Sequence, residues 1–182
     1  MVYIILGNGF EETEATTPYD ILRRGGVEAV FAGVQGRKVM SAHGIDYTAH
    51  CTVSDIDLNK AEMVVLPGGL GGVECIESSK DTLDMVKAAY DRGIEIAAIC
   101  AGPRVLSRLG ILKGRKATCY PGLDAQINGA EMHTELSVVR EEKLTTGRGP
   151  GASFDFGFAL LEVLRGKETA DRIAGDMCFE RK

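Results

Sequence analysis

Short apolar runs alternate with amphipathic stretches along almost the whole chain, and this alternation constrains the fold more than any other feature. The apolar runs are predicted strands, at residues 2–6, 27–34, 63–66, 94–99 and 116–119. The amphipathic stretches are predicted helices, at residues 11–24, 82–92 and 103–109. Wholly apolar strands separated by helices are typical of a mostly parallel sheet covered on both faces. We therefore expect an α/β fold.

The remaining segments extend this pattern without interrupting it. Val39-Met40 and Ile45-Asp46-Tyr47 flank His43-Gly44 and predict a small hairpin. Residues 136–140 and 144–146 are predicted to form a late pair of strands, and residues 153–164 and 168–174 two closing helices. No internal repeat, low-complexity tract or linker interrupts the sequence. We therefore interpret residues 1–182 as one domain.

The composition argues against several kinds of partner. The chain has 182 residues and a formal net charge of -5 at pH 7, whereas a nucleic-acid-binding domain needs a basic face to neutralise phosphates. The first residues lack the basic lead-in of a targeting peptide, and no apolar run approaches the ~20 residues that a membrane span needs. We expect a cytoplasmic protein that binds neither nucleic acid nor membranes.

The cysteines and histidines favour neither a disulfide framework nor a metal site. The five cysteines are an odd number, are widely spaced and include no Cys-x-x-Cys pair. They are Cys51, Cys75, Cys100, Cys119 and Cys178. None of the three histidines, His43, His50 and His133, has a spacing typical of metal ligands, and each is interpreted as a surface or hydrogen-bonded residue.

The strongest chemical signal is the segment Ala97-Ala98-Ile99-Cys100-Ala101-Gly102-Pro103. A buried strand ends, one nucleophilic side chain follows, and small residues lead into a helix, as in the nucleophile elbow of hydrolases. A thiol before a helix N-terminus is expected to form a thiolate readily. The alternative is a buried structural cysteine at a strand end.

A carboxylate-rich segment, Gly9-Phe10-Glu11-Glu12-Thr13-Glu14, follows the first strand. The carboxyl ends of parallel strands meet at one edge of a sheet, where ligands bind, so a carboxyl group here can approach Cys100. It could then donate a hydrogen bond to a thiolate or move a proton on a substrate. The alternative is an acidic first turn that complements the helix dipole.

Two glycine-rich segments also follow predicted strands. Pro67-Gly68-Gly69-Leu70-Gly71-Gly72 lacks the Lys-Ser/Thr ending of a nucleotide-binding loop. Its glycines either bring backbone N–H groups close to an anion or oxyanion, or serve only as turn residues. The segment 147–153, which contains Arg148, Gly149 and Pro150, leads into the helix predicted at Ser153.

In this order, the four segments resemble the ThiJ/PfpI superfamily, in the branch of the parkinsonism-associated protein and its bacterial relatives. The matching stretches are Gly9-Phe10-Glu11-Glu12-Thr13-Glu14, Val65-Leu66-Pro67-Gly68-Gly69, Ala97-Ala98-Ile99-Cys100-Ala101-Gly102-Pro103 and Arg148-Gly149-Pro150-Gly151-Ala152-Ser153-Phe154. The resemblance covers nearly the whole chain. It implies a flavodoxin-like sandwich, usually a homodimer, with no metal or organic cofactor.

The resemblance also implies roles for individual residues. The family's elbow cysteine falls on Cys100, and its glutamic acid falls on Glu14. Its oxyanion-type backbone donors fall on Gly69 and Ala101. Tyr120, Gly68, Gly149 and Pro150 are expected to line the site, and the family's cysteine near the dimer contact corresponds loosely to Cys51.

Two positions depart from the family's pattern. Protease-like members have histidine directly after the nucleophile, where this chain has Ala101, so a peptidase is disfavoured. Many members of the closer branch have histidine before a proline near the site, where this chain has Tyr120-Pro121. Tyrosine, with a pKa of about 10, is a poor base near neutrality. Proton transfer is therefore expected to depend on Glu14.

Two classes of function remain open. The first is a cofactor-independent glyoxalase or deglycase, in which the Cys100 thiolate attacks methylglyoxal or glyoxal and the hydroxy acid is released. The second is a redox sensor or stress-protective protein, in which peroxide oxidises Cys100 to a sulfinate, with a weaker possibility of chaperone activity. Both use the same accessible thiolate, and the first is favoured.

Overall fold

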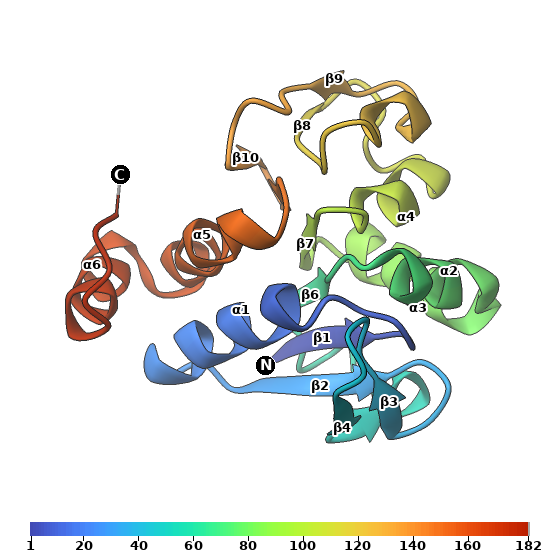
Figure 1. Ribbon diagram of the computed structural model, residues 1–182, viewed down its shortest axis with the longest axis horizontal. Helices are drawn as coiled ribbons and strands as arrows, with labels where there is room; N and C mark the ends of the chain where they lie inside the picture. The colour runs from blue at the N-terminus through green and yellow to red at the C-terminus, as the bar shows by residue number, and fades with distance from the viewer. Residues whose placement is uncertain (182) are drawn as a thin grey trace.

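A seven-stranded sheet forms the centre of the protein in a computed structural model that describes residues 1–181 (Figure 1). The order of its strands is β10-β11-β7-β6-β1-β2-β5, and every neighbouring pair is parallel except β10 with β11. Their bounds are β1 Val2–Leu6, β2 Ala29–Gly33, β5 Cys51–Thr52, β6 Met63–Leu66, β7 Glu95–Ile99, β10 Val138–Glu141 and β11 Leu144–Gly147. The sequence-based prediction of a mostly parallel sheet is confirmed.

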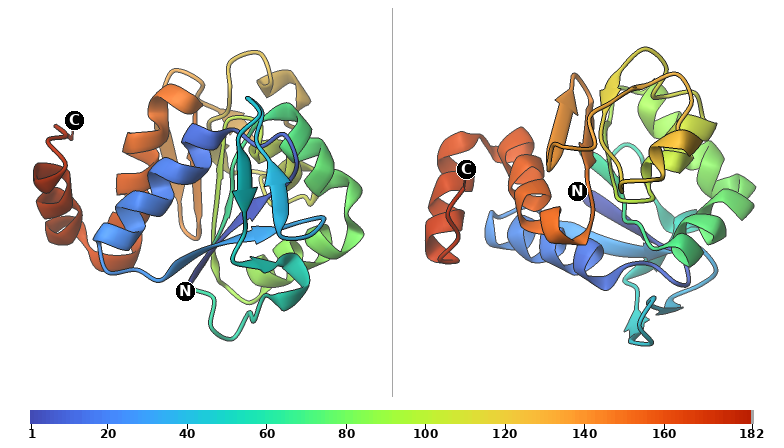
Figure 2. Two further views of the ribbon diagram at one scale, coloured as in Figure 1. Left: turned by 60° about the horizontal axis from the view of Figure 1, so that its bottom comes forward. Right: turned by 45° about the horizontal axis from the view of Figure 1, so that its top comes forward.

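Six helices within residues 1–181 flank this sheet (Figures 1 and 2). One face is covered by α1 Glu12–Arg24 and α5 Ser153–Arg165, and α6 Lys167–Asp176 packs on the outside of α5. The other face is covered by α2 Leu70–Ser78, α3 Lys80–Asp91 and α4 Pro103–Arg108. Each strand serves both cores because successive side chains point to opposite faces. In β1, Ile4 and Leu6 pack into the first core, and Tyr3 and Ile5 into the second.

Several smaller elements surround the sheet. A separate hairpin stands away from it (Figure 2) and is formed by β3 Lys38–Met40 and β4 Asp46–Thr48. A short parallel pair is formed by β8 Lys116–Ala117 and β9 Glu131–Met132. Three 3₁₀ turns complete the chain, at Val53–Asp55, Asp124–Gln126 and Pro150–Ala152. Among residues 1–181, no helix has the length and apolar character needed to cross a membrane.

Most predicted elements are found within a few residues of their expected ends. The hairpin, the late strand pair and the two closing helices are confirmed. The strand predicted at 116–119 is wrong in part, because only Lys116–Ala117 is a strand and it pairs with β9 outside the main sheet. The next residue, Thr118, donates its N–H to Oγ1 of Thr146 on β11 instead. Strands β5 and β9, of two residues each, were not predicted.

Helix α2 was also not predicted, because its first turn contains Gly71 and Gly72, which read as a loop. The structure gives a packing reason for Gly72. A β-carbon at this position would lie 2.7 Å from Cα and 2.8 Å from the backbone nitrogen of Phe10. Gly72 therefore lets α2 pack directly against the loop between β1 and α1, which leads to Glu14.

This close approach predicts opposite effects for two Gly→Ala substitutions in helices. Gly72→Ala should destabilise the fold by about 1–3 kcal/mol, because the methyl group meets backbone atoms that cannot rotate away. Gly175→Ala, in α6, should stabilise it by about 0.5–1 kcal/mol, because an added β-carbon there meets no atom within 4 Å. Urea unfolding would measure both. Equal effects would show that the contact at Gly72 is unimportant.

Candidate active site

The four segments that stood out in the sequence meet at one edge of the sheet. Strands β11, β7, β6 and β1 are consecutive neighbours and run parallel, so their carboxyl ends lie side by side (Figure 1). Each segment directly follows one of these strands. Ligand sites of open parallel sheets are found at this edge.

Cys100 occupies a strained turn at the end of β7. Its φ is 63°, in the left-handed region that non-glycine residues rarely adopt. The turn is held on both sides: the Cys100 N–H donates to the carbonyl of Gly147 at 2.9 Å, and the Cys100 carbonyl accepts from the Tyr120 N–H at 3.0 Å. A β-carbon on Gly102 would lie 2.4 Å from the carbonyl oxygen of Leu66. The expected elbow is confirmed as a backbone geometry, and Cys100 is half-buried in it.

Glu14 is wholly buried in the first turn of α1, beside the elbow. Its Oε2 accepts a hydrogen bond from the Gly68 N–H at 2.8 Å. Its Oε1 is buried and has no hydrogen-bond partner among residues 1–181. A β-carbon on Gly68 would lie 2.6 Å from Oε2 of Glu14 and 2.7 Å from Cβ of Cys100. Gly68 therefore lets the carboxyl group and the cysteine approach each other, and one carboxyl oxygen stays free.

The ionisation of Glu14 and Cys100 is coupled. Burial raises the pKa of Glu14 from 4.5 to about 7, while the neighbouring Cys100 thiol and the Gly68 N–H lower it. Burial and the neighbouring Glu14 carboxylate raise the pKa of Cys100, while the N–H groups of Gly69 and Ala101 lower it. Because each negative charge disfavours the other, the thiolate is favoured when Glu14 holds a proton. The prediction that Cys100 readily forms a thiolate is therefore wrong while Glu14 is charged, because that charge raises the pKa of the thiol.

The two expected backbone donors, Gly69 and Ala101, lie close enough to Cys100 to act on its ionisation. Their N–H groups lower the pKa of the Cys100 thiol, and their role as oxyanion donors stays a prediction. Gly69 has a φ of 81°, and a β-carbon on it would lie 2.3 Å from the carbonyl oxygen of Gly9. Only glycine fits this position, so the glycine-rich segment does more than form a turn.

The residues expected to line the site divide into two groups. Gly68 lies between Glu14 and Cys100, whereas Tyr120, Gly149 and Pro150 line a surface hollow of about 480 Å³. The Tyr120 side chain is half-exposed, and a β-carbon on Gly149 would lie 3.2 Å from its ring. The larger hollow of the described chain, about 610 Å³ between β10 and α5, contains none of the expected site residues.

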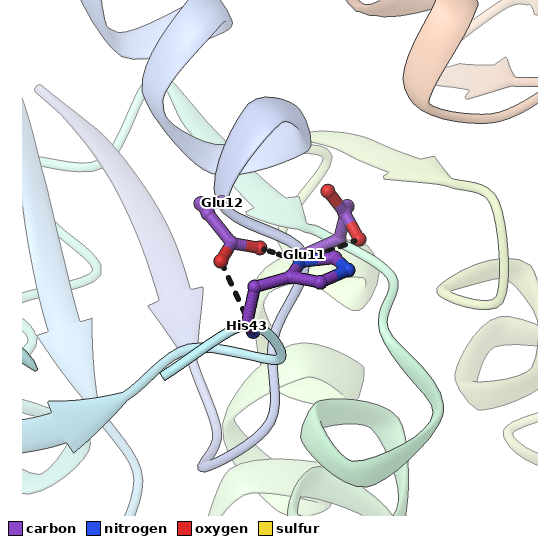
Figure 3. A group of neighbouring side chains, drawn as sticks. All are labelled: Glu11, Glu12 and His43. Carbon is purple, nitrogen blue, oxygen red and sulfur yellow. Dashed lines mark hydrogen bonds and ion pairs between the residues drawn. The ribbon is translucent and has the colours of Figure 1, made fainter. Parts of the chain in front are cut away.

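The other two glutamates of the acidic segment have a different partner, which the sequence did not reveal. Figure 3 shows His43, from the hairpin turn, pointing toward Glu11 and Glu12. Glu12 accepts hydrogen bonds from the Ser41 hydroxyl at 2.8 Å and from the His43 N–H at 3.1 Å, and its second oxygen lies 2.9 Å from Nδ1 of His43. Glu12 therefore links the hairpin to the start of α1 by hydrogen bonds, in addition to its expected interaction with the helix dipole.

The same three side chains are the one group of histidine and carboxylate ligands in residues 1–181 with metal-like spacing. The ligand atoms of Glu11, Glu12 and His43 lie within 4.8 Å of one another. Both oxygens of Glu12 already accept hydrogen bonds from the hairpin. The ligand atoms of Glu12 and His43 are thus already engaged in contacts within the protein, and a metal ion would have to break the Glu12–His43 pair in order to bind.

The remaining histidines and Cys51 lie away from the elbow. Nδ1 of His50 accepts the Phe31 N–H at 3.0 Å, and His133 contacts two exposed glutamates. The interpretation of hydrogen-bonded histidines is confirmed. Cys51 is half-buried in edge strand β5, and its place near a subunit contact stays a prediction.

The raised pKa of Glu14 predicts that folding stability falls as pH rises from 4.5 to about 7. Below 4.5 the carboxyl group is protonated in the folded and the unfolded state. Between the two pKa values only the unfolded state loses the proton, so stability is lost, and the loss is complete above the folded pKa of about 7. Glu14→Gln, which cannot ionise, should therefore be more stable than the wild type at pH 8, by up to about 3 kcal/mol. Near pH 4 the two proteins should be equally stable. Urea unfolding from pH 4 to 8 would test this, and a constant difference would contradict the raised pKa.

The Glu12–His43 pair predicts a second pH effect. The Glu12 carboxylate raises the pKa of His43 above its usual 6.5, and hydrogen bonds hold the pKa of Glu12 at about 2. Both side chains are thus charged at pH values above the usual pKa of a glutamate. The ion pair is lost when His43 gives up its proton, as pH rises through the raised pKa of His43. NMR titration should show His43 titrating at higher pH in the wild type than in Glu12→Gln. Identical titration curves would mean that the pair does not form in solution.

Comparisons with known sequences agree with this geometry. Residues 1–163 match the DJ-1/PfpI family. Protein dj-1beta of Drosophila melanogaster is 34% identical over 173 residues, which are 94% of this chain and 92% of that protein. A Caenorhabditis elegans protein named glutathione-independent glyoxalase DJR-1.2 is 29% identical over 171 residues, which are 94% of this chain and 91% of that protein.

Solved structures give the same result. Drosophila melanogaster DJ-1beta has a TM-score of 0.95 at 32% identity, and the match covers 99% of this chain and 98% of that one. Oxidised Toxoplasma gondii DJ-1 has a TM-score of 0.91 at 33% identity, over 99% and 98% of the two chains. The flavodoxin-like arrangement implied by the sequence is confirmed. The chain belongs to the DJ-1/PfpI family, in its DJ-1 branch.

Proposed function

We propose that this protein is a cysteine-dependent glyoxalase that converts methylglyoxal or glyoxal to the hydroxy acid without glutathione. The observation that carries the proposal is the Glu14 carboxyl group. It is buried beside Cys100, has one oxygen without a partner among the described residues, and has a pKa of about 7. A group with this pKa can both accept and return a proton near neutral pH.

In the first step, the Cys100 sulfur attacks the aldehyde carbon of methylglyoxal. The C=O π bond becomes a C–O single bond, and the oxygen takes the proton that Glu14 held, so that a hemithioacetal forms and Glu14 is left ionised. The N–H groups of Gly69 and Ala101, which lower the pKa of the Cys100 thiol, would stabilise the developing negative oxygen. Before this step Glu14 holds the proton, which leaves the thiol free to act as thiolate.

In the second step, ionised Glu14 moves a proton between the two reacting carbons. It removes the C–H proton of the hemithioacetal, an enediolate forms, and the proton returns to the neighbouring carbon, while the hydroxyl proton passes from the first oxygen to the oxygen of that neighbouring carbon. The product is a thioester of lactate on Cys100. The same carboxyl group is the source and the destination of the proton, so a second base at Tyr120 is not required.

In the last step, water hydrolyses the thioester and releases lactate with the free thiol. The sum is methylglyoxal plus water giving lactate and one proton, with no change in overall oxidation state. The reaction therefore requires no redox cofactor. The name of the C. elegans relative DJR-1.2 supports this assignment, at 29% identity.

The proposal predicts a separate loss of activity for each of the two side chains. With methylglyoxal and no glutathione, Cys100→Ser should lose lactate formation by at least about 10³-fold, and Glu14→Gln by about 10²–10⁴-fold. Glu14→Gln should still form the hemithioacetal, because it keeps the thiol. Enzymatic assay of lactate would measure turnover, and intact-protein mass would measure the adduct.

Cys178→Ser is the matched control, because Cys178 is exposed and lies after α6. It should keep full turnover. Stoichiometric loss of methylglyoxal without lactate, or equal rates in Cys100→Ser and the wild type, would show that exposed thiols and amines merely scavenge the aldehyde.

A second candidate function is peroxide sensing by the same cysteine. It is favoured by the backbone N–H groups at the sulfur and by an oxidised structure among the relatives, that of Toxoplasma gondii DJ-1. Two equivalents of hydrogen peroxide would convert the thiolate to a sulfinate and release two water molecules. Protonated Glu14 would donate a hydrogen bond to the sulfinate. Selective gain of two oxygen atoms at Cys100 under mild peroxide, in a protein without glyoxalase turnover, would favour this alternative.

A further inference from the structure

The hollow beside the elbow presents hydrogen-bond donors and one cation. Its polar side chains are the Arg148 guanidinium, the Tyr120 hydroxyl and the Ser137 hydroxyl, and no acidic residue lines it. An arginine donates only, and its planar fork matches the two oxygens of a carboxylate. The chemistry of this wall therefore suits an anion, although the whole chain is acidic.

The hollow is connected to Cys100 by the backbone on two sides. Arg148 directly follows Gly147, whose carbonyl accepts the Cys100 N–H at 2.9 Å. Tyr120, on the other wall, donates its N–H to the Cys100 carbonyl at 3.0 Å. Tyr120, which lines the hollow, and Gly147, which directly precedes Arg148, thus hold the elbow, so the hollow and the elbow share backbone contacts.

The Arg148 side chain is open to a ligand. Several other arginines of the fold form ion pairs, for example Arg104 with Glu77 and Arg181 with Glu162. Within residues 1–181, no carboxylate forms an ion pair with Arg148. The acidic residue that feels its charge, Glu135, is exposed and contacts His133 at 3.1 Å. The Arg148 backbone is nevertheless fixed, because its N–H donates to the Ser137 carbonyl at 2.9 Å.

We propose that Arg148, with the hydroxyl groups of Tyr120 and Ser137, binds a carboxylate on the substrate, so that α-oxo aldehydes with a carboxylate at their far end are preferred over neutral ones. The proposal rests on the proposed glyoxalase function for the reaction at Cys100. A hollow of about 480 Å³ leaves room for several atoms more than methylglyoxal has. Arg148 is then a specificity-determining residue that acts on binding.

The first test compares an anionic substrate with its neutral analogue: 4,5-dioxopentanoate and its methyl ester, which has one methyl group more. The ratio of kcat/KM for the acid to kcat/KM for the ester should be above one in the wild type. It should fall about fivefold in Arg148→Gln, which is the size of effect expected for an exposed ion pair. The preference should also weaken at high salt. A general structural defect would lower both rates and leave the ratio unchanged.

Arg92→Gln is the matched control. Arg92 is an exposed arginine after α3, close to the start of β7 and therefore at the opposite edge of the sheet from Cys100. The same charge change there should not alter the ratio. An equal fall in both variants would overturn the proposal, because it would reflect net charge alone.

The second test does not depend on glyoxalase turnover. Iodoacetate and iodoacetamide alkylate the same sulfur and differ in charge, and peptide-level mass spectrometry measures each rate at Cys100 alone. Arg148→Gln should lower the iodoacetate-to-iodoacetamide rate ratio, and Arg92→Gln should not. If this ratio responds to Arg148 while no dicarbonyl is turned over, the anion site stands and the glyoxalase function fails. If neither ratio responds to Arg148, the anion site is refuted whether or not methylglyoxal is turned over.

Discussion

The hydrogen bond from the Gly68 N–H to Oε2 of Glu14 is the contact on which the site depends. It joins the loop after β6 to the first turn of α1, and it holds a wholly buried carboxyl group against the turn that carries Cys100. The glycine is required twice, because its N–H is the donor and a β-carbon there would collide with both the carboxyl group and the cysteine. Because Oε1 has no hydrogen-bond partner among the described residues, burying the charged carboxylate costs free energy, and this cost raises the pKa of Glu14.

This cost of burial is what makes the pair chemically useful. A solvated glutamate would be fully ionised at neutral pH and could not hold a proton for the thiol. Buried next to a thiol, Glu14 can exchange its proton with Cys100 or with a carbon acid near pH 7. Stability is given up for this property, because the charged form of Glu14 disfavours the folded state. Strained and destabilised groups of this kind concentrate at functional sites.

The surroundings of the pair follow from the same edge of the sheet. Parallel strands bring four loops together. The loop after β1 supplies the Glu14 carboxyl group, the loop after β6 supplies Gly69, the loop after β7 supplies the thiol and Ala101, and the loop after β11 supplies Arg148 and part of the donor-rich hollow. The hairpin that carries His43 is hydrogen-bonded to the start of α1 through Glu12, two residues before the buried carboxyl group of Glu14. Replacing histidine by Tyr120 removes a base from this edge and adds a hydroxyl donor, which fits a wall that binds an anion.

The sequence by itself determined the α/β class, most element positions and the elbow turn at Cys100, because buried strands, helical faces and a nucleophile between small residues are local patterns. The role of Glu14 was implied by the family resemblance and stays a prediction. Helix α2 was not predicted, since Gly71 and Gly72 have low helix propensity and are tolerated only through packing on Phe10. Tertiary structure alone decided which of three neighbouring glutamates is buried, that Glu12 pairs with His43, and that Arg148 and Tyr120 share one hollow. Burial and pairing depend on residues far apart in the chain, and no local pattern contains that information.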